Sequence, residues 1–273
     1  MPVSLDQIVA STRRKMSEAR ARVDRRALER LAEVHVPRGF RRALEFRARN
    51  GPAVIPELKK ASPSRGLIRA DFDPRSLAVE FEQAGAAALS VLTDAEFFQG
   101  SLQNLQIASA NTKLPCLRKD FIVDELQLLE ARAYGADAVL LIAAALTPKE
   151  ITHLAARASE YGLDVLCEVH DERELQQAVD NGFDLIGVNN RNLRTFRVDL
   201  ETAFRVAKRI PTNVVRVAES GIHNGTDIAR LRGAGYHGFL IGESLMAQAS
   251  PADALRQMLA AERSLALNAE TSR

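Results

Sequence analysis

The stretch Val54-Ile55-Pro56-Glu57-Leu58-Lys59 runs from a short apolar segment straight into charged side chains. Buried parallel strands appear in a sequence as continuous apolar runs, so a charge at the carboxyl end of one is costly unless the protein uses it. The same arrangement recurs in Leu117-Arg118-Lys119, Val165-Leu166-Cys167-Glu168, Ile186-Gly187-Val188-Asn189 and Val215-Arg216-Val217-Ala218-Glu219-Ser220. These strand ends together indicate one polar site on an α/β scaffold, and therefore an enzyme.

From residue 52 onward, apolar runs alternate with segments of helical periodicity. Successive runs begin roughly 21 to 34 residues apart, which is the length of one strand, one helix and two short loops. Glycines suited to the left-handed residue after a helix, such as Gly135, Gly162 and Gly182, separate several of these units. We expect eight strands, at 54–58, 88–92, 115–118, 138–143, 164–168, 185–188, 214–218 and 238–241.

Eight strand–helix units predict an α/β fold of the (βα)8 TIM barrel type rather than a doubly wound sheet. A nucleotide-binding doubly wound sheet needs a glycine-rich turn after its first strand. Here that strand continues into Lys59-Lys60-Ala61-Ser62-Pro63-Ser64, and no GxGxxG or GxxxxGK motif occurs. We expect a single domain over 1–273, with an N-terminal helical extension (1–46), the barrel (47–265) and a disordered tail (266–273). Active sites of such barrels lie at the carboxyl ends of the strands.

The N-terminal extension is rich in arginine. Residues 1–50 hold twelve arginines and one lysine against six acids, although the net charge of the whole chain is only +2. The extension is either an amphipathic segment packed on the barrel with solvated arginines, or a surface for a phosphate-rich partner such as RNA. Because acids interrupt the arginines and no aromatic residues are spaced for base stacking, we favour the first and expect no nucleic-acid partner.

The apolar stretches, the cysteines and the histidines limit the class of protein that this sequence can encode. No apolar stretch approaches the length of a membrane span or of a signal-peptide core, so we expect no membrane association. Cys116 and Cys167 fall inside predicted strands and indicate buried thiols, which suits the cytoplasm. The five histidines lack the spacing of metal ligands, so we expect no metal. We expect a monomer or a weak homo-oligomer.

Side chains alternate along a strand, so Glu57 and Lys59 share the face of Ile55, and Lys119 shares the face of Leu117. Glu168 and Glu219 follow apolar residues in the same way. The simplest arrangement is an apolar barrel interior capped by a charged layer at the mouth. A closed ion-pair network without chemistry is the alternative, but crowding of charges in one layer is more typical of a catalytic site.

Glycine-containing turns follow the last two predicted strands. Ser220-Gly221-Ile222 and Gly242-Glu243-Ser244 stand where barrels commonly bind phosphate through backbone N–H groups. We expect the Glu243 N–H to bind the anion while its carboxylate points outward. Aromatic residues form only 5% of the chain, so Phe98 and Phe121, just beyond two strand ends, either fill the core or line a flat pocket for an aromatic substrate.

The motifs in this order closely resemble those of the indole-3-glycerol phosphate synthase family, the barrel enzymes of the tryptophan pathway. The resemblance covers nearly the whole chain, with one motif for each of several strands. The matching segments are Glu57-Leu58-Lys59-Lys60-Ala61-Ser62-Pro63-Ser64, Leu92-Thr93-Asp94, Leu117-Arg118-Lys119-Asp120-Phe121-Ile122, Gly187-Val188-Asn189-Asn190-Arg191-Asn192-Leu193, Ala218-Glu219-Ser220-Gly221-Ile222 and Ile241-Gly242-Glu243-Ser244-Leu245-Met246.

The resemblance implies a ring closure that needs no cofactor. The substrate would be a phosphorylated aromatic molecule, 1-(2-carboxyphenylamino)-1-deoxyribulose 5-phosphate, and the products indole-3-glycerol phosphate, carbon dioxide and water. An aromatic carbon attacks the ketone, the carboxylate is lost, and a hydroxyl leaves as water. Such a reaction needs an acid at the developing oxyanion and at the departing hydroxyl, and a base for the ring proton.

By similarity, Lys119 is the general acid and Glu168 the base. The remaining catalytic residues that the resemblance implies are Glu57 near the reacting centre, Lys59 at the substrate carboxylate and as a second candidate acid, and Asn189 and Glu219 at the sugar hydroxyls. The implied substrate-binding residues are Arg191 beside Lys59, then Ser62, Ser220, Gly221, Gly242 and Glu243 for the anion, and Phe98, Phe121 and Leu193 around the aromatic ring. How the two lysines divide the acid work stays open.

Two buried lysines close together should depress each other's pKa, so we expect Lys119 to titrate below its ordinary value. We also expect activity to fall at low pH as Glu168 becomes protonated. Three rivals remain. Related phosphate-binding barrels would need a Cys–Asp pair or metal-binding histidines at strand ends, and no histidine ends a predicted strand. A non-catalytic phosphometabolite-binding barrel would lack some charges of the mouth, and an RNA-binding protein would depend on residues 1–46.

Overall fold

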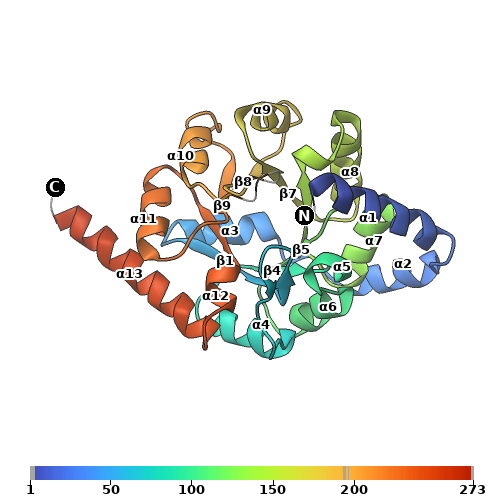
Figure 1. The fold of residues 1–273 in the computed structure, drawn as a ribbon, viewed down its shortest axis with the longest axis horizontal. Coiled ribbons are helices and arrows are strands. Elements are labelled where there is room, and N and C mark those ends of the chain that lie inside the picture. The colour runs from blue at the N-terminus through green and yellow to red at the C-terminus, as the bar shows by residue number, and fades with distance from the viewer. Residues whose placement is uncertain (1–3, 193–194, 196, 272–273) are drawn as a thin grey trace.

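The computed structural model describes residues 4–192, 195 and 197–271, and these form a closed barrel of eight parallel strands (Figure 1). The strands close in the order β1-β10-β9-β8-β7-β6-β5-β4. They are β1 (Ala53–Leu58), β4 (Leu89–Leu92), β5 (Cys116–Lys119), β6 (Ala138–Ile142), β7 (Asp164–Val169), β8 (Leu185–Asn189), β9 (Val215–Glu219) and β10 (Gly238–Ile241). Every predicted strand is present, and the predicted TIM barrel is confirmed.

Helices follow the strands and form the outer layer of the barrel. They are α4 (Pro74–Gln83), α6 (Leu102–Ala110), α7 (Glu125–Ala133), α8 (Pro148–Glu160), α9 (Glu172–Asp180), α10 (Glu201–Ala207), α11 (Gly225–Gly233) and α13 (Pro251–Thr271). Short elements lie in the loops at the carboxyl ends of the strands. These are the hairpin of β2 (Ala61–Ser62) and β3 (Gly66–Leu67), α5 (Ala95–Phe98), the 3-10 turn η1 (Ala143–Ala145) and α12 (Glu243–Met246).

Successive side chains of each strand point alternately into the barrel and toward the outer helices, which produces two separate apolar cores. Ile55, Leu117 and Leu166 pack together inside the barrel. Their sequence neighbours Val54 and Cys167 pack instead against the surrounding helices. Because the interior is filled by these side chains, the charged residues that follow on the same face can only gather at the mouth.

The N-terminal extension forms three helices, α1 (Leu5–Arg20), α2 (Arg25–Val34) and α3 (Phe40–Ala48). Helix α3 inserts Phe40 and Leu44, both fully buried, into the cluster of barrel-interior side chains. Helix α2 packs against α7 through a small apolar cluster that includes Leu28 and Leu129. In Figure 1, α1 and α2 lie beside α7 and α8. The expected packing of the extension on the barrel is therefore observed.

Most arginines of the extension are exposed, as we expected, but several of them pair with acids of the barrel. Arg13 pairs with Glu150 of α8 at 2.8 Å, and Arg20 pairs with Asp124 before α7 at 2.6 Å. Arg38 binds the fully buried Asp137 carboxylate at 2.6 Å. The positive charge of the extension is thus partly neutralised by acids of the barrel.

The C-terminal segment also differs from expectation. Helix α13 continues to Thr271, so the segment from 266 to 271 is helical where we expected a disordered tail, and residues 272–273 lie outside the described part of the chain. Among the described residues, no helix combines the length and the apolar character needed to cross a membrane.

Candidate active site

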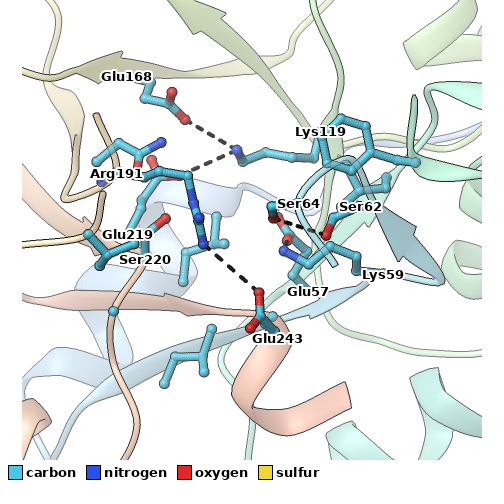
Figure 2. A pocket seen from close by; sticks show the side chains of 18 of the residues that line it. Glu57, Lys59, Ser62, Ser64, Lys119, Glu168, Arg191, Glu219, Ser220 and Glu243 are labelled. Atoms are coloured by element: carbon cyan, nitrogen blue, oxygen red, sulfur yellow. Dashed lines mark hydrogen bonds and ion pairs between the residues drawn. The ribbon is translucent and has the colours of Figure 1, made fainter. Parts of the chain in front are cut away.

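A cavity of about 380 Å³ opens at the carboxyl ends of the barrel strands (Figure 2). Fourteen of the fifteen predicted site residues line it, and Leu193 lies outside the described residues. The predicted residues among those that line it are Glu57, Lys59, Ser62, Phe98, Lys119, Phe121, Glu168, Asn189, Arg191, Glu219, Ser220, Gly221, Gly242 and Glu243. Leu140 and Ile142 of β6 line it as well, so residues from all eight barrel units share one space.

Lys119, the last residue of β5, lies between two buried carboxylates at the centre of the site. Its Nζ is 3.2 Å from Glu168 Oε2 and 3.5 Å from Glu219 Oε2. Glu168 comes from β7 and Glu219 from β9, the strand opposite β5 in the closed barrel, so the contacts of Lys119 reach across the mouth. An ammonium group in this position can give a proton to a ligand in the cavity.

A second ion pair lies on the β1 side of the mouth, where Lys59 Nζ is 2.7 Å from Glu57 Oε1. Gly242, the residue after β10, makes room for this pair. A Cβ atom at position 242 would lie 2.6 Å from Glu57 Oε1 and 3.0 Å from Lys59 Nζ. The glycine that we assigned to phosphate binding is therefore also required by the charged layer.

The expected depression of the Lys119 pKa is wrong. Burial would lower the pKa of Lys119, but the carboxylates of Glu168, Glu219 and Glu57 outweigh it and raise the pKa above its ordinary value. Burial would likewise raise the pKa of Glu57, but the nearby Lys59 and Lys119 lower it. The prediction failed because it considered only the two lysines, whereas three carboxylates surround Lys119.

The two carboxylates beside Lys119, Glu168 and Glu219, have pKa values shifted in opposite directions. Burial would raise the pKa of Glu168, yet Lys119 and His170 hold it well below the ordinary range. Burial and the Glu168 carboxylate instead raise the pKa of Glu219, despite its contact with Lys119. Glu168 is therefore the ionised carboxylate of the pair and the candidate base, while Glu219 favours its protonated form.

Gly187 of β8 leaves the space that the Glu219 carboxylate occupies. A Cβ at this position would lie 2.1 Å from Glu219 Oε1. We expect Gly187→Ala to push Glu219 away from Lys119 and to lower kcat by roughly 100-fold, the cost of a displacement of about 1 Å in a catalytic site. Steady-state kinetics of the folded variant measure this.

Gly233→Ala is the matched control, because a Cβ at position 233 in α11 meets open space. It should leave kcat unchanged. Near-normal turnover in Gly187→Ala would mean that catalysis does not depend on the observed position of Glu219.

The turns after β9 and β10 form another wall of the cavity. Ser220 adopts a left-handed conformation with φ of 64°, and Gly221 follows with φ of 78°. Left-handed backbone is unfavourable for a residue with a side chain and is concentrated at functional sites. The turn therefore bends sharply at the position where we expect the anion.

The Glu243 carboxylate does not point away from the site. Its Oε1 accepts a hydrogen bond from Arg65 Nε at 2.7 Å, and its Oε2 is 3.9 Å from Arg191 Nη2 across the mouth (Figure 2). Two guanidinium groups thus hold it at the rim, which our expectation from the sequence did not include. Arg65 belongs to the β2–β3 hairpin, and nothing in its local sequence indicated this partner.

Phe98 and Phe121 form an aromatic wall of the cavity. Their ring centroids are 6.1 Å apart and the rings are tilted by 37°. Both rings remain partly exposed to the cavity. Leu5 and Ile8 of α1 also line the cavity, so the extension closes part of the mouth, a role that its apolar stripe had not indicated.

His170 is the residue that sequence reasoning missed. It directly follows β7, and its Nε2 lies 3.3 Å from Glu168 Oε1. No described strand ends in a histidine, as we expected, but β7 extends one residue further than predicted and His170 follows it directly. The signal was present in the alternation rule, since residues 168 and 170 share one face of an extended chain.

Comparisons with known proteins agree with this geometry. The family model described as indole-3-glycerol phosphate synthase matches residues 5–258. A protein of that name from Koribacter versatilis is 59% identical over 259 residues, covering 95% of this chain and all of the relative. Another from Desulfotalea psychrophila is 48% identical over 257 residues, covering 93% of this chain and 97% of the relative.

A solved structure, thiamine phosphate pyrophosphorylase from Pyrococcus furiosus, superposes with a TM-score of 0.58 at 16% identity. It covers 80% of this chain and 98% of that chain. At this identity the likeness concerns the fold alone. The family match and the two relatives span nearly the whole chain, and the motifs of the mouth lie within them. This chain therefore belongs to the indole-3-glycerol phosphate synthase family.

Proposed function

We propose that Lys119 and Glu168 are the acid and the base with which this barrel converts 1-(2-carboxyphenylamino)-1-deoxyribulose 5-phosphate to indole-3-glycerol phosphate, carbon dioxide and water. As a member of its family, the protein is a carboxy-lyase of tryptophan biosynthesis. The observation that supports the residue assignment is the partly buried Lys119 ammonium between the buried Glu168 and Glu219 carboxylates in a ligand-sized cavity.

In the first step Lys119 gives a proton to the ketone oxygen while the aromatic carbon attacks the carbonyl carbon. Loss of carbon dioxide then restores the aromatic ring. The raised pKa of Lys119 keeps it protonated before the reaction, and a developing oxyanion is basic enough to take the proton. Lys59 and Arg191 stand on the rim, where the substrate carboxylate can reach both cations.

In the second step the hydroxyl takes a proton from Lys59, the second candidate acid, and leaves as water, while Glu168 accepts the proton from the neighbouring carbon. Once Lys119 has lost its proton, the cation that depressed the pKa of Glu168 is gone, so Glu168 becomes a stronger base. The 3.2 Å contact then lets Glu168 return its proton to Lys119. One further proton enters from solvent and replaces the negative charge lost with the carboxylate.

The rest of the substrate matches the rest of the cavity. We assign the phosphate to the backbone at Ser220, Gly221, Gly242 and Glu243 with Ser62 nearby, and the aromatic ring to Phe98 and Phe121, with Leu193 proposed from the sequence alone. Asn189 and Glu219 remain for the sugar hydroxyls. Two free, buried cysteines support a reducing compartment such as the cytoplasm, and a monomer or weak homo-oligomer stays a prediction.

The direct test is to supply the carboxyphenylamino-deoxyribulose phosphate and follow indole fluorescence. The chain contains no tryptophan, so the protein contributes little background. We expect product without any added cofactor. Folded protein that binds the substrate but forms no indole would instead favour the non-catalytic phosphometabolite-binding barrel.

A further inference from the structure

We propose that His170 is a positioning residue for the base: anchored by Glu174, it holds the Glu168 carboxylate at the oxygen that Lys119 does not contact. This inference rests on the proposed function, because it takes Glu168 as the group that accepts the ring proton. It adds a residue that neither touches the reacting atoms nor belongs to the charged layer read from the strand ends.

The contacts of His170 are specific on both sides of its ring. Nδ1 is 3.0 Å from Glu174 Oε2, and the same oxygen accepts the His170 backbone N–H at 2.8 Å. Nε2 is buried and lies 3.3 Å from Glu168 Oε1. Within the described chain Nε2 has no partner with hydrogen-bond geometry, so its contact with Glu168 is a charge contact at ion-pair distance. Each ring nitrogen thus faces a carboxylate oxygen, and both can be satisfied only when each carries a proton.

The charges around His170 favour that doubly protonated form. Burial would lower the pKa of His170, but Glu168 and Glu174 outweigh it and raise the pKa to about 10. Lys119 lies beyond Glu168 on the barrel side. The other charged groups near His170 line a neighbouring cavity of about 1140 Å³. They are Asp6 of α1, Asp171 and Arg173 at the start of α9, Arg191, Arg197 and Asp199 after β8, and Arg205 of α10.

The contact with His170 keeps the Glu168 carboxylate in place during the step in which Lys119 is neutral. When Lys119 gives its proton away, Glu168 Oε2 loses its cationic partner at the moment when the base must stay in place. His170 keeps its own proton, because Glu174 stabilises the cation, and so it continues to hold Oε1. A neutral ring with its proton on Nδ1 would instead turn the Nε2 lone pair toward Glu168, and the repulsion would displace the base.

Glu174→Gln tests this with little change of shape. An amide oxygen can accept both hydrogen bonds that Oε2 accepts, so the anchor remains while its charge is lost. Loss of a carboxylate at this distance should lower the pKa of His170 by about 1–3 units. The alkaline limb of the kcat profile should therefore move from near pH 10 toward lower pH by that amount, with KM unchanged. Glu80→Gln, at an exposed site, is the control.

His170→Gln should lower kcat roughly tenfold at pH values below the alkaline limb and should remove that limb, because the titrating group is gone. Adding Glu174→Gln to His170→Gln should then change the profile no further. A limb that stays at its wild-type position in Glu174→Gln overturns the proposal, as does a limb that still moves when His170 is absent.

Should a variant not fold, NMR titration of the wild-type imidazoles decides the matter. His170 should stay doubly protonated through pH 8, and a transition near the ordinary value of about 6.5 contradicts the proposal. The failure of the proposed function is recognised separately. If Glu168→Gln is inactive while Glu174→Gln has a wild-type profile, only the role of His170 is refuted, whereas an active Glu168→Gln refutes both.

Discussion

Lys119→Ala is expected to lower kcat by about 10³–10⁴-fold while the affinity for substrate changes less than tenfold. The reason is that the Lys119 ammonium, between Glu168 and Glu219, acts on charge that develops only in the transition state. Single-turnover measurements should show that neither carbon dioxide nor indole is released at a normal rate, because the first bond-forming step is blocked.

Removing Lys119 also leaves two buried carboxylates without their shared cation, so a second variant is needed. Lys119→Arg keeps a positive charge between them, but arginine does not give up its proton at ordinary pH. It should fold normally and still turn over slowly. Near-normal turnover of Lys119→Arg would show that charge alone, not proton transfer, is what this position supplies. The exposed Lys113→Ala is the control for a lysine deletion.

Glu168→Gln is expected to lower indole formation by about 10²–10⁴-fold. Because the base acts after decarboxylation, this variant should still release carbon dioxide in the first turnover, while indole fluorescence appears slowly or not at all. Measuring the two products separately distinguishes it from Lys119→Ala, in which both are lost. Release of carbon dioxide and indole at equal, normal rates would exclude Glu168 as the base.

The pH profile of the wild-type protein follows from the same carboxylate. A carboxylate with a depressed pKa stays ionised below the ordinary value of about 4.3, and its function is lost only as pH falls through the depressed value. The loss of activity at low pH that we expected for Glu168 is therefore moved to more acidic conditions. We expect kcat to hold constant down to mildly acidic pH, with any loss near pH 6 assigned to another group.

Local patterns determined much of the fold and of the candidate site. Each apolar run became a barrel strand because β strands buried on both faces must be continuously apolar. The period of two along β1 and β5 placed Glu57, Lys59 and Lys119 on the inner face, and the closed barrel then had to bring their carboxyl ends to one mouth. For this reason the sequence alone predicted the charged residues of the mouth.

Only the tertiary structure decided the partners and the electrostatics of these residues. Arg38 and Asp137 are 99 positions apart, and Arg65 and Glu243 are 178 apart, so no local pattern could pair them. The pKa of Lys119 depends on carboxylates from three other strands, and its predicted direction was wrong for that reason. The position of His170 beside Glu168 required the turn that brings Glu174 back to its ring. Electrostatic energies depend on distances of a few ångströms between groups far apart in the chain, and only the folded packing sets those distances.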